Sequence, residues 1–256
     1  MAFDIPRDAM TPVARVELDR DPAPHPFEAA NRPEIDRNWA VEHAANPALF
    51  DGRMMLFSEL SLRGDVLAGR CHEVRYATLL YWRKYPGMAL AEHAFAHAAL
   101  VARDGALVAI RMGRHTANPD GVYFAAGSFE REDFAGGRCD LPRNMAREVG
   151  EETGLDIAGL RQDPYYVLFS RNHSTAIFRR YWLDDDAETV AGKIRAFVAA
   201  ETDPEIEGPV IISAGEPLPA GIKPHMAAFC DWHFGRPQIT AIDAPSGDPI
   251  SNRDSP

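Results

Sequence analysis

Three glutamates lie close together in the stretch REVGEETGL, which covers residues 147–155. Successive residues of an α-helix are about 100° apart, so in a helix Glu148, Glu151 and Glu152 would fall within an arc of about 100°. Carboxylates at these spacings repel one another by around 0.2–0.5 kcal/mol per pair, and the helix dipole disfavours anions near a C-terminal end. Either this face is a solvated acidic surface or divalent cations occupy it, and the two penalties favour cations.

Such a face could support magnesium-dependent phosphate chemistry. Mg²⁺ binds a few carboxylates, keeps several waters and completes its coordination with phosphate oxygens. The formal net charge of -11 would repel an anionic substrate, and bound cations would turn the repulsive patch into a receptor for a diphosphate. They could also polarise a phosphoryl group and lower the pKa of the attacking water. Arg147 is placed to hold one of the glutamates through a bidentate pair.

The stretch resembles the second half of the Nudix box, in which Arg-Glu-apolar-x-Glu-Glu-x-Gly-apolar closes a loop–helix–loop. The specified positions are occupied by Arg147, Glu148, Val149, Glu151, Glu152, Gly154 and Leu155. The hairpin at 99–113 resembles the opening strands of the family, and VYFAAGSFE (122–130) resembles the beginning of its box, with Gly127 as the leading glycine and Glu130 as the acidic residue of the first loop. The resemblance covers about residues 93–235.

The first loop departs from the family pattern. Eight residues before Arg147, where the pattern has a glutamate, this chain has Cys139 followed by Asp140. The loop is about six residues longer than in the family. The three glutamates that resemble the metal ligands are unaffected, but the conformation of the loop is left open.

The resemblance implies hydrolysis of a nucleoside diphosphate linked to another moiety, with Mg²⁺ or Mn²⁺ as cofactor. Glu148, Glu151 and Glu152 would be the metal ligands, with one of them a candidate base, and Arg147 would orient them. Members of the family often take an additional base from a loop late in the domain. Glu205 and Glu207 lie in the corresponding region here, and solvated surface glutamates are the alternative interpretation.

Residues outside the box offer further substrate contacts. Arg111 and Arg114 end a predicted strand and could meet a phosphate or a nucleobase edge, or could be surface arginines. Four aromatic residues of predicted strands could stack on a base, although such residues more often belong to a core. They are Tyr123, Phe124, Tyr165 and Tyr166.

Composition excludes several classes of protein. The chain has no basic block, which argues against binding to nucleic acid or to an anionic membrane surface. The first ten residues do not resemble a secretory signal, and the longest apolar run (88–102) is interrupted by charged and histidine residues. The three cysteines form no CxxC pair, which indicates a reducing compartment. We therefore expect a cytoplasmic protein. The resemblance to the Nudix family implies a small nucleoside diphosphate derivative as its partner, and a homodimer is a candidate assembly.

The distribution of patterns predicts an α+β fold. Helical spacing or capping signals mark residues 26–46, 140–154, 187–200 and 223–234. Alternating or apolar runs predict strands at 55–60, 66–67, 74–79, in the hairpin 93–115, and at 122–127, 165–170, 177–183 and 208–213, with 128–140 as a loop. The resemblance implies a Nudix-type α/β/α sandwich with a mixed β-sheet. We place an accessory β-rich segment at 1–90, the Nudix hydrolase domain at 91–240 and a disordered tail at 241–256.

The sequence is compatible with two functions from different classes. The first is a Nudix-type pyrophosphohydrolase, with a nucleotide sugar or a dinucleotide as the guessed substrate. The second is a non-catalytic Nudix-fold module that senses a nucleotide. The intact set of glutamates favours the enzyme, and the altered first loop and the N-terminal extension favour the module.

Overall fold

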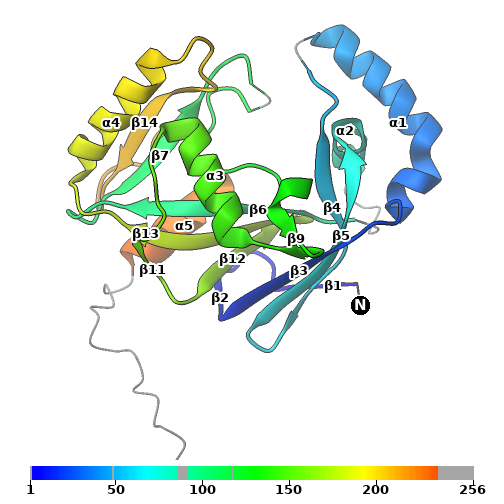
Figure 1. The fold of residues 1–256 in the computed structure, drawn as a ribbon, viewed down its shortest axis with the longest axis horizontal. Coiled ribbons are helices and arrows are strands. Elements are labelled where there is room, and N and C mark those ends of the chain that lie inside the picture. Colours follow the sequence, from blue (N-terminus) through cyan, green and yellow to red (C-terminus); the bar gives the residue numbers. More distant parts are fainter. Residues whose placement is uncertain (1, 48, 86–90, 117, 236–256) are drawn as a thin grey trace, which may run out of the picture.

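Two mixed β-sheets and five α-helices make up the described part of the chain, as the sequence predicted for the α+β class (Figure 1). The structure is a computed structural model that describes residues 2–47, 49–85, 91–116 and 118–235. The predicted tail at 241–256 lies outside these residues. Within the described residues, no helix is long and apolar enough to cross a membrane.

The larger sheet carries the site and has the strand order β14-β7-β6-β13-β12-β2. Strands β6 and β13 pair in parallel, and the other neighbours pair antiparallel, so the sheet is mixed. Short strands β8 and β11 pair with β7 and β13 off this path. The members are β2 (Thr11–Val13), β6 (His93–Val101), β7 (Leu107–Met112), β8 (Val122–Tyr123), β11 (Arg161–Gln162), β12 (Tyr166–Arg171), β13 (Ser174–Trp182) and β14 (Ile206–Ile212).

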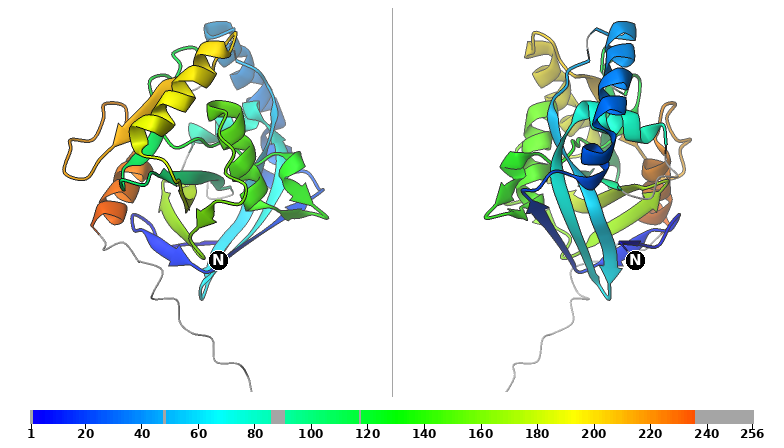
Figure 2. Two further views of the ribbon diagram at one scale, coloured as in Figure 1. Left: turned by 60° about the vertical axis from the view of Figure 1, so that its left-hand side comes forward. Right: turned by 90° about the vertical axis from the view of Figure 1, so that its right-hand side faces the viewer.

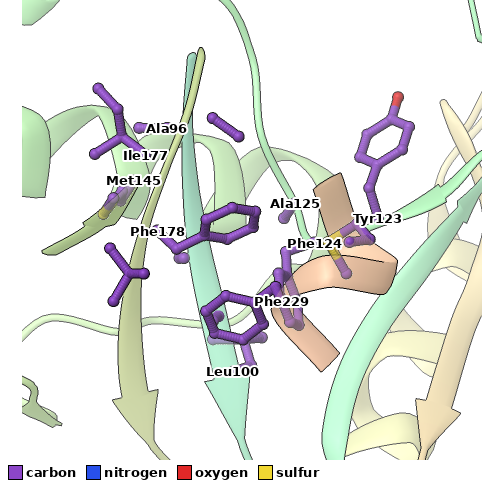
Figure 3. Packing of buried hydrophobic residues seen from close by; sticks show 14 of the residues in the cluster. Ala96, Leu100, Tyr123, Phe124, Ala125, Met145, Ile177, Phe178 and Phe229 are labelled. Atoms are coloured by element: carbon purple, nitrogen blue, oxygen red, sulfur yellow. The ribbon is translucent and has the colours of Figure 1, made fainter. Parts of the chain in front are cut away.

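Helices cover both faces of this sheet. Alternate residues of a strand point to opposite faces, so Ile177 and Phe178 of β13 meet different helices. Ile177 lies on the side of Met145 from α3 (Leu141–Thr153), and the Phe178 ring stacks on Phe229 from α5 (Pro224–Phe234) with centroids 4.5 Å apart (Figure 3). Helix α4 (Ala187–Ala200) packs along β14 and β7. The result is the α/β/α layering expected from the sequence.

The smaller sheet has the order β1-β4-β5-β3-β10-β9 and lies beside the larger one (Figure 2). Its strands are β1 (Phe3–Asp4), β3 (Arg15–Asp21), β4 (Arg53–Arg63), β5 (Val66–Arg75), β9 (Phe134–Ala135) and β10 (Arg138–Cys139). Helix α1 (Pro26–Ala45) and helix α2 (Tyr76–Arg83) pack on each other beside this sheet. The segment predicted as a loop at 128–140 therefore contains two short strands, after the short 3-10 helix η1 (Arg131–Asp133).

The prediction of strand for residues 74–79 was wrong after Arg75. Tyr76 and Leu79 lie in α2, where Leu79 packs into a small core with Phe27 of α1. The Asp51 carboxylate accepts a hydrogen bond of 2.9 Å from Ala77 N and so supplies a cap for the first turn of α2. This cap comes from a distant segment, and the local sequence of the helix gave no sign of it.

Strands from both sides of residue 90 meet in each sheet. Strand β2 pairs with β12, and β10 pairs with β3. The Glu92 carboxylate is fully buried and forms an ion pair with Arg7 at 2.5 Å. The division into an accessory segment at 1–90 and a hydrolase domain at 91–240 stays a prediction.

Candidate active site

The three predicted site glutamates lie on α3, whose limits follow from local sequence. The Asp140 side chain caps the helix by accepting a hydrogen bond from Arg143 N at 3.1 Å, and Gly154 ends it in the left-handed conformation with φ 69°. A Cβ on Gly154 would lie 2.3 Å from the Phe197 ring of α4, so glycine is needed for close packing as well. Glu148 and Glu152 are buried, whereas the side chain of Glu151 is 60% exposed.

Arg147 binds carboxylates on both sides of it. Its guanidinium lies 2.8 Å from Glu148 Oε1, 3.0 Å from Glu151 Oε2 and 3.2 Å from Asp133 Oδ2. Asp133 is buried and also accepts hydrogen bonds of 2.9 Å from Asn144 Nδ2 and from Glu130 N. Arg147 is thereby anchored at one end and presents the rest of its guanidinium to the glutamates.

Sequence reasoning did not identify Asp133. The residue belongs to the lengthened first loop, ahead of Cys139, where the family pattern had led us to look for an acidic residue. One signal was available: Glu130 and Asp133 are three residues apart and cap η1 reciprocally, which is the spacing of a capping box.

The backbone at 126–127 packs directly on the two buried glutamates. Ala126 N donates a hydrogen bond of 3.0 Å to Glu152 Oε2. A Cβ on Gly127 would lie 2.2 Å from Glu148 Oε1, which is closer than any real contact. A side chain at position 127 would therefore displace the Glu148 carboxylate from its present position.

The glutamates line a cleft of about 310 Å³, which we call the acidic cleft. Glu148, Glu151 and Glu152 form one wall of it. The remaining lining residues come from the end of α4 and the segment before and into β14, and are Phe197, Val198, Glu201, Asp203, Pro204, Glu205 and Ile206. Of the described residues that line the acidic cleft, none carries a positive charge.

Without a bound cation, ionisation of the buried glutamates of the cleft is unfavourable. Burial raises the pKa of Glu152 to about 9, and the charge on Glu148 adds to this effect. Burial likewise raises the pKa of Glu148 to about 7, although Arg147 acts in the opposite direction. In the described part of the chain, no three His, Cys, Asp or Glu side chains are already arranged around a common point that could hold a metal ion. Arg147 is the cation that contacts Glu148 and Glu151.

The other predicted site residues lie in different places. Glu205 and Glu207 are both exposed; Glu205 lines the acidic cleft, whereas Glu207 lies 3.9 Å from Arg114. Arg111 Nη1 donates to the backbone oxygens of Asp120 and Ala220 at 3.2 and 3.0 Å and so joins two loops. The side chain of Arg114 is 82% exposed. The structure thus brings Glu205 to the three glutamates and leaves Arg111, Arg114 and Glu207 outside the cleft lining.

Of the aromatic candidates, Tyr123 lines a second cavity on the other side of residues 126–127. Phe124 is fully buried in the core. The hydroxyl groups of Tyr165 and Tyr166 accept hydrogen bonds from Arg180 and Arg179, where β12 begins and β13 ends.

Comparison with protein-family models finds no match, and neither does comparison with curated protein sequences. Solved structures show weak likenesses. The protein DR0079 of Deinococcus radiodurans is 15% identical, with 63% of this chain and 83% of that chain covered and a TM-score of 0.39. The MutT protein of Methanosarcina mazei Go1 is 17% identical, with 56% and 90% covered and a TM-score of 0.34. A bifunctional NMN adenylyltransferase/ADP ribose pyrophosphatase of Francisella tularensis, complexed with AMP and Mn ion, is 15% identical, with 49% and 35% covered and a TM-score of 0.30.

Proposed function

We propose that the protein is a Nudix-type, metal-dependent hydrolase that cleaves the diphosphate linkage between a nucleoside and another moiety. One observation carries this proposal: the three glutamates of the box line a single cleft together with Glu205, and Gly127 lies against Glu148. A solvated acidic surface would not bury two of its three carboxylates.

The donor set fits a hard divalent cation. The acidic cleft offers only carboxylate oxygens as charged ligands, the type that Mg²⁺ and Mn²⁺ prefer. Glu148, Glu151 and Glu152 are the residues that would hold Mg²⁺ or Mn²⁺. When bound, such a cation would neutralise the cleft, polarise the phosphoryl group and lower the pKa of a bound water.

The side chains have separate tasks in this mechanism. Asp133 fixes Arg147, and Arg147 orients Glu148 and Glu151. The Ala126 amide fixes one oxygen of Glu152, which leaves the other free to face the cleft. Glu205 lines the same cleft and would be the additional residue that accepts a proton from the attacking water.

The second candidate function is a Nudix-fold module that binds a nucleotide without cleaving it. Arg147 already neutralises two of the glutamates, and no preset metal site exists among the described residues. In such a module the carboxylates would serve the fold and would not take part in a reaction.

Turnover of a substrate panel separates the two functions. The full chain is incubated with Mg²⁺ or Mn²⁺ and with ADP-ribose, NADH, UDP-sugars, coenzyme A, diadenosine polyphosphates and dNTPs, and products are separated by ion-exchange chromatography. A nucleotide sugar or a dinucleotide is our expected substrate. Glu151→Gln and Glu152→Gln should each lower turnover by about 100-fold or more, since each removes a metal-binding charge.

The matched control is Glu188→Gln, the same change at an exposed residue of α4 that pairs with Arg195 at 3.1 Å. It should keep wild-type turnover. Wild-type turnover in both cleft variants would refute the hydrolase. Tight binding of a panel member that is never cleaved would favour the sensing module. A cytoplasmic location and a homodimer stay predictions.

A further inference from the structure

The first loop, residues 128–140, leads into helix α3 and is attached to the smaller sheet at both of its ends. Near its start, Met55 N of β4 donates a hydrogen bond of 2.9 Å to the backbone oxygen of Phe129. The Phe129 ring is fully buried and lies edge-on to the ring of Phe57 on the same strand, with centroids 6.2 Å apart. Strand β4 therefore holds the beginning of the loop.

The end of the loop extends the smaller sheet through the β9–β10 hairpin (Figure 1). Arg20 N of β3 donates a hydrogen bond of 2.7 Å to the backbone oxygen of Gly137, and Arg138 lies opposite Asp19 in the antiparallel ladder. The Arg138 guanidinium also forms ion pairs with Asp19 at 3.1 Å and with Glu17 at 3.8 Å. Strand β3 therefore holds the end of the loop.

Asp133 lies between these two attachments. Its backbone oxygen accepts a hydrogen bond of 2.8 Å from Asp140 N, the residue that caps α3. Its buried carboxylate binds Asn144 at 2.9 Å and Arg147 at 3.2 Å. Backbone and side chain of Asp133 thus tie the loop to the first two turns of α3, and the place of Asp133 decides where the Arg147 guanidinium lies.

An alternative is that the loop holds Arg147 by its own contacts and that the smaller sheet contributes nothing. The regular structure within the loop consists of η1, with three residues, and of a hairpin with two residues in each strand. A hairpin of this kind is not stable by itself. Gly136 and Gly137 form its turn, and glycine loses more conformational entropy on ordering than any other residue. The contacts with β3 and β4 offset these costs.

We propose that the smaller sheet positions Arg147 for the reaction, because β4 and β3 hold the two ends of the first loop and the loop holds the arginine through Asp133. Arg138 is then a positioning residue, since it is not among the described residues that line the acidic cleft. This role rests on the proposed function, because the position of Arg147 matters only if the glutamates of α3 take part in a reaction. It gives the predicted accessory segment at 1–90 a part in the active site.

Charge reversal at Arg138 tests the attachment to β3. Arg138→Glu replaces two ion pairs by repulsion from Glu17 and Asp19, so amide hydrogen exchange in residues 129–140 of the full chain should become about tenfold faster. Exchange in α5 should not change, which separates a loosened loop from global unfolding. The kcat for a cleaved panel substrate should fall about threefold or more, with KM within about twofold of the wild type. Asp19→Arg combined with Arg138→Glu restores opposite charges and should restore both properties.

Arg195→Glu is the matched control for this reversal. The side chains of Arg138 and Arg195 are both 56% exposed, and Arg195 pairs with Glu188 at 3.1 Å, the distance between Arg138 and Asp19. Because Arg195 belongs to α4, its reversal should leave kcat and exchange in residues 129–140 as in the wild type.

A second variant disturbs the hairpin through its turn. Gly136 has φ 58°, and a Cβ there would meet nothing within 4 Å, so Gly136→Val adds backbone strain without a clash. Gly64 is the matched control, because it lies in the turn between β4 and β5 of the same sheet, has φ 61° and also has open space around a Cβ. Gly136→Val should change exchange and kcat as Arg138→Glu does, and Gly64→Val should change neither.

A measurement on Arg147 itself does not require turnover. Its Nε lies 3.4 Å from Asp133 Oδ1, and its Nε–H signal in a nitrogen-15 NMR spectrum can be assigned by its loss in Arg147→Lys. In the wild type this hydrogen should exchange slowly with water. It should exchange faster in Arg138→Glu and in Gly136→Val, and slowly again in the double variant with Asp19→Arg.

Wild-type exchange, kcat and Arg147 signal in both Arg138→Glu and Gly136→Val would overturn the positioning role. Faster exchange in the loop with an unchanged Arg147 signal and kcat would do the same, since the loop would then hold the arginine without the sheet. So would a double variant that recovers nothing. If Arg138→Glu does not fold, Gly136→Val decides. Cleavage of a diphosphate by the wild type leaves the proposed function intact in each of these cases, and if no panel member is cleaved, exchange and the Arg147 signal still decide the role of the sheet.

Discussion

The acidic cleft adjoins a second cavity of about 500 Å³, the histidine pocket, which is lined by His93, His97 and His225 among other residues. The backbone at 126–127 lies between the two cavities, and they differ in the charged groups that line them. The cleft is lined by carboxylates and no cations, and the pocket by cations, neutral histidines and no carboxylates, within the described residues. A chain with a net charge of -11 can therefore have a cavity lined by carboxylates and a cavity lined by cations side by side. The difference shows that the net charge of the chain does not predict the charge of an individual cavity, which depends on the residues that line it.

The two cavities also differ in how they are built. Glu148, Glu151 and Glu152 of the cleft come from one helix, and Arg147, which contacts the first two of them, is anchored by a single residue of the preceding loop, Asp133. The pocket is assembled from α2, β6, β12, β13, the segment 123–128 and the start of α5. A change at Asp133 should thus affect one cavity, and a change at Gly127 should affect both.

Asp133→Ala should produce the largest change in stability. It removes a buried carboxylate that binds Arg147, Asn144 and the Glu130 amide, and leaves these groups with unmet hydrogen-bonding capacity. We expect a loss of about 3 kcal/mol in the free energy of unfolding, measured by urea denaturation. Asp19→Ala, which removes an exposed carboxylate paired with Arg138 at 3.1 Å, should cost under about 1 kcal/mol. Equal losses in the two variants would show that Asp133 is not an anchor.

Gly127→Ala should disturb both cavities at their common wall. The new Cβ would lie 2.2 Å from Glu148 Oε1, so either the carboxylate or the backbone must move. A displacement of about 1 Å at a catalytic group can reduce turnover by about 100-fold, equivalent to about 2.7 kcal/mol.

Gly192→Ala is the matched control for this change. Gly192 lies inside α4, and a Cβ there would meet nothing within 4 Å. Alanine is the better helix former, so this variant should be as active as the wild type and slightly more stable. Wild-type turnover in Gly127→Ala would mean that the wall between the cavities is not tightly packed.

Local signals predicted much of the acidic cleft and little of the histidine pocket. Helix α3 was predictable because its cap, its apolar spacing and its terminating glycine all lie within residues 140–154. Glu205 was a candidate by its place in the chain, and the structure adds that it lines the cleft whereas Glu207 does not. Asp133 was missed because its partners, Asn144 and Arg147, are 11 and 14 residues away, across a loop of unusual length.

The pocket depends on contacts that local sequence does not encode. His97 and His225 are far apart in the chain, and their stacking follows from the position of α5 on the larger sheet. Leu79 lines the pocket from a helix that the pattern of alternating residues had assigned to a strand. Asp51 caps the first turn of this helix from a distant part of the chain, and such a tertiary contact can override local strand propensity.

The buried histidines of the pocket should lower the free energy of unfolding of the protein as the pH falls. Burial lowers the pKa of His225 to about 4, that of His93 to about 3, and that of His97 well below the usual value of 6.5. At pH 5 these histidines are protonated in the unfolded chain and neutral in the folded one, so acid favours unfolding. Between pH 7 and pH 5, His97→Phe should lose about 2 kcal/mol less in the free energy of unfolding than the wild type.

His43→Phe is the control for this pH effect, because His43 is an exposed residue of α1. Its variant should lose as much stability as the wild type between the two pH values. A pH dependence of His97→Phe that matches the wild type would place His97 in contact with water or with a charge that holds its proton.

The buried Glu152 of the acidic cleft should make the free energy of unfolding change with pH in the opposite direction. Burial raises the pKa of Glu152 to about 9 in the folded protein, so the stability that its protonated form contributes is present below pH 4.5 and is lost as the pH rises through 9. Glu152→Gln keeps an acceptor for the Ala126 amide and carries no charge. In EDTA its free energy of unfolding should be larger than that of the wild type at pH 8, and this gain should shrink towards pH 5.

Added Mg²⁺ sharpens this prediction, because a cation that binds only the folded wild type stabilises it and leaves the variant unchanged. The gap between the two proteins should therefore narrow or reverse in Mg²⁺, whereas Glu188→Gln should follow the wild type in both buffers. If the wild type were the more stable protein at pH 8 in EDTA, Glu152 would be held ionised by the fold itself. The cleft would then not need a metal ion to balance its charge. Its only difference from the histidine pocket would be the sign of the charge on the lining residues.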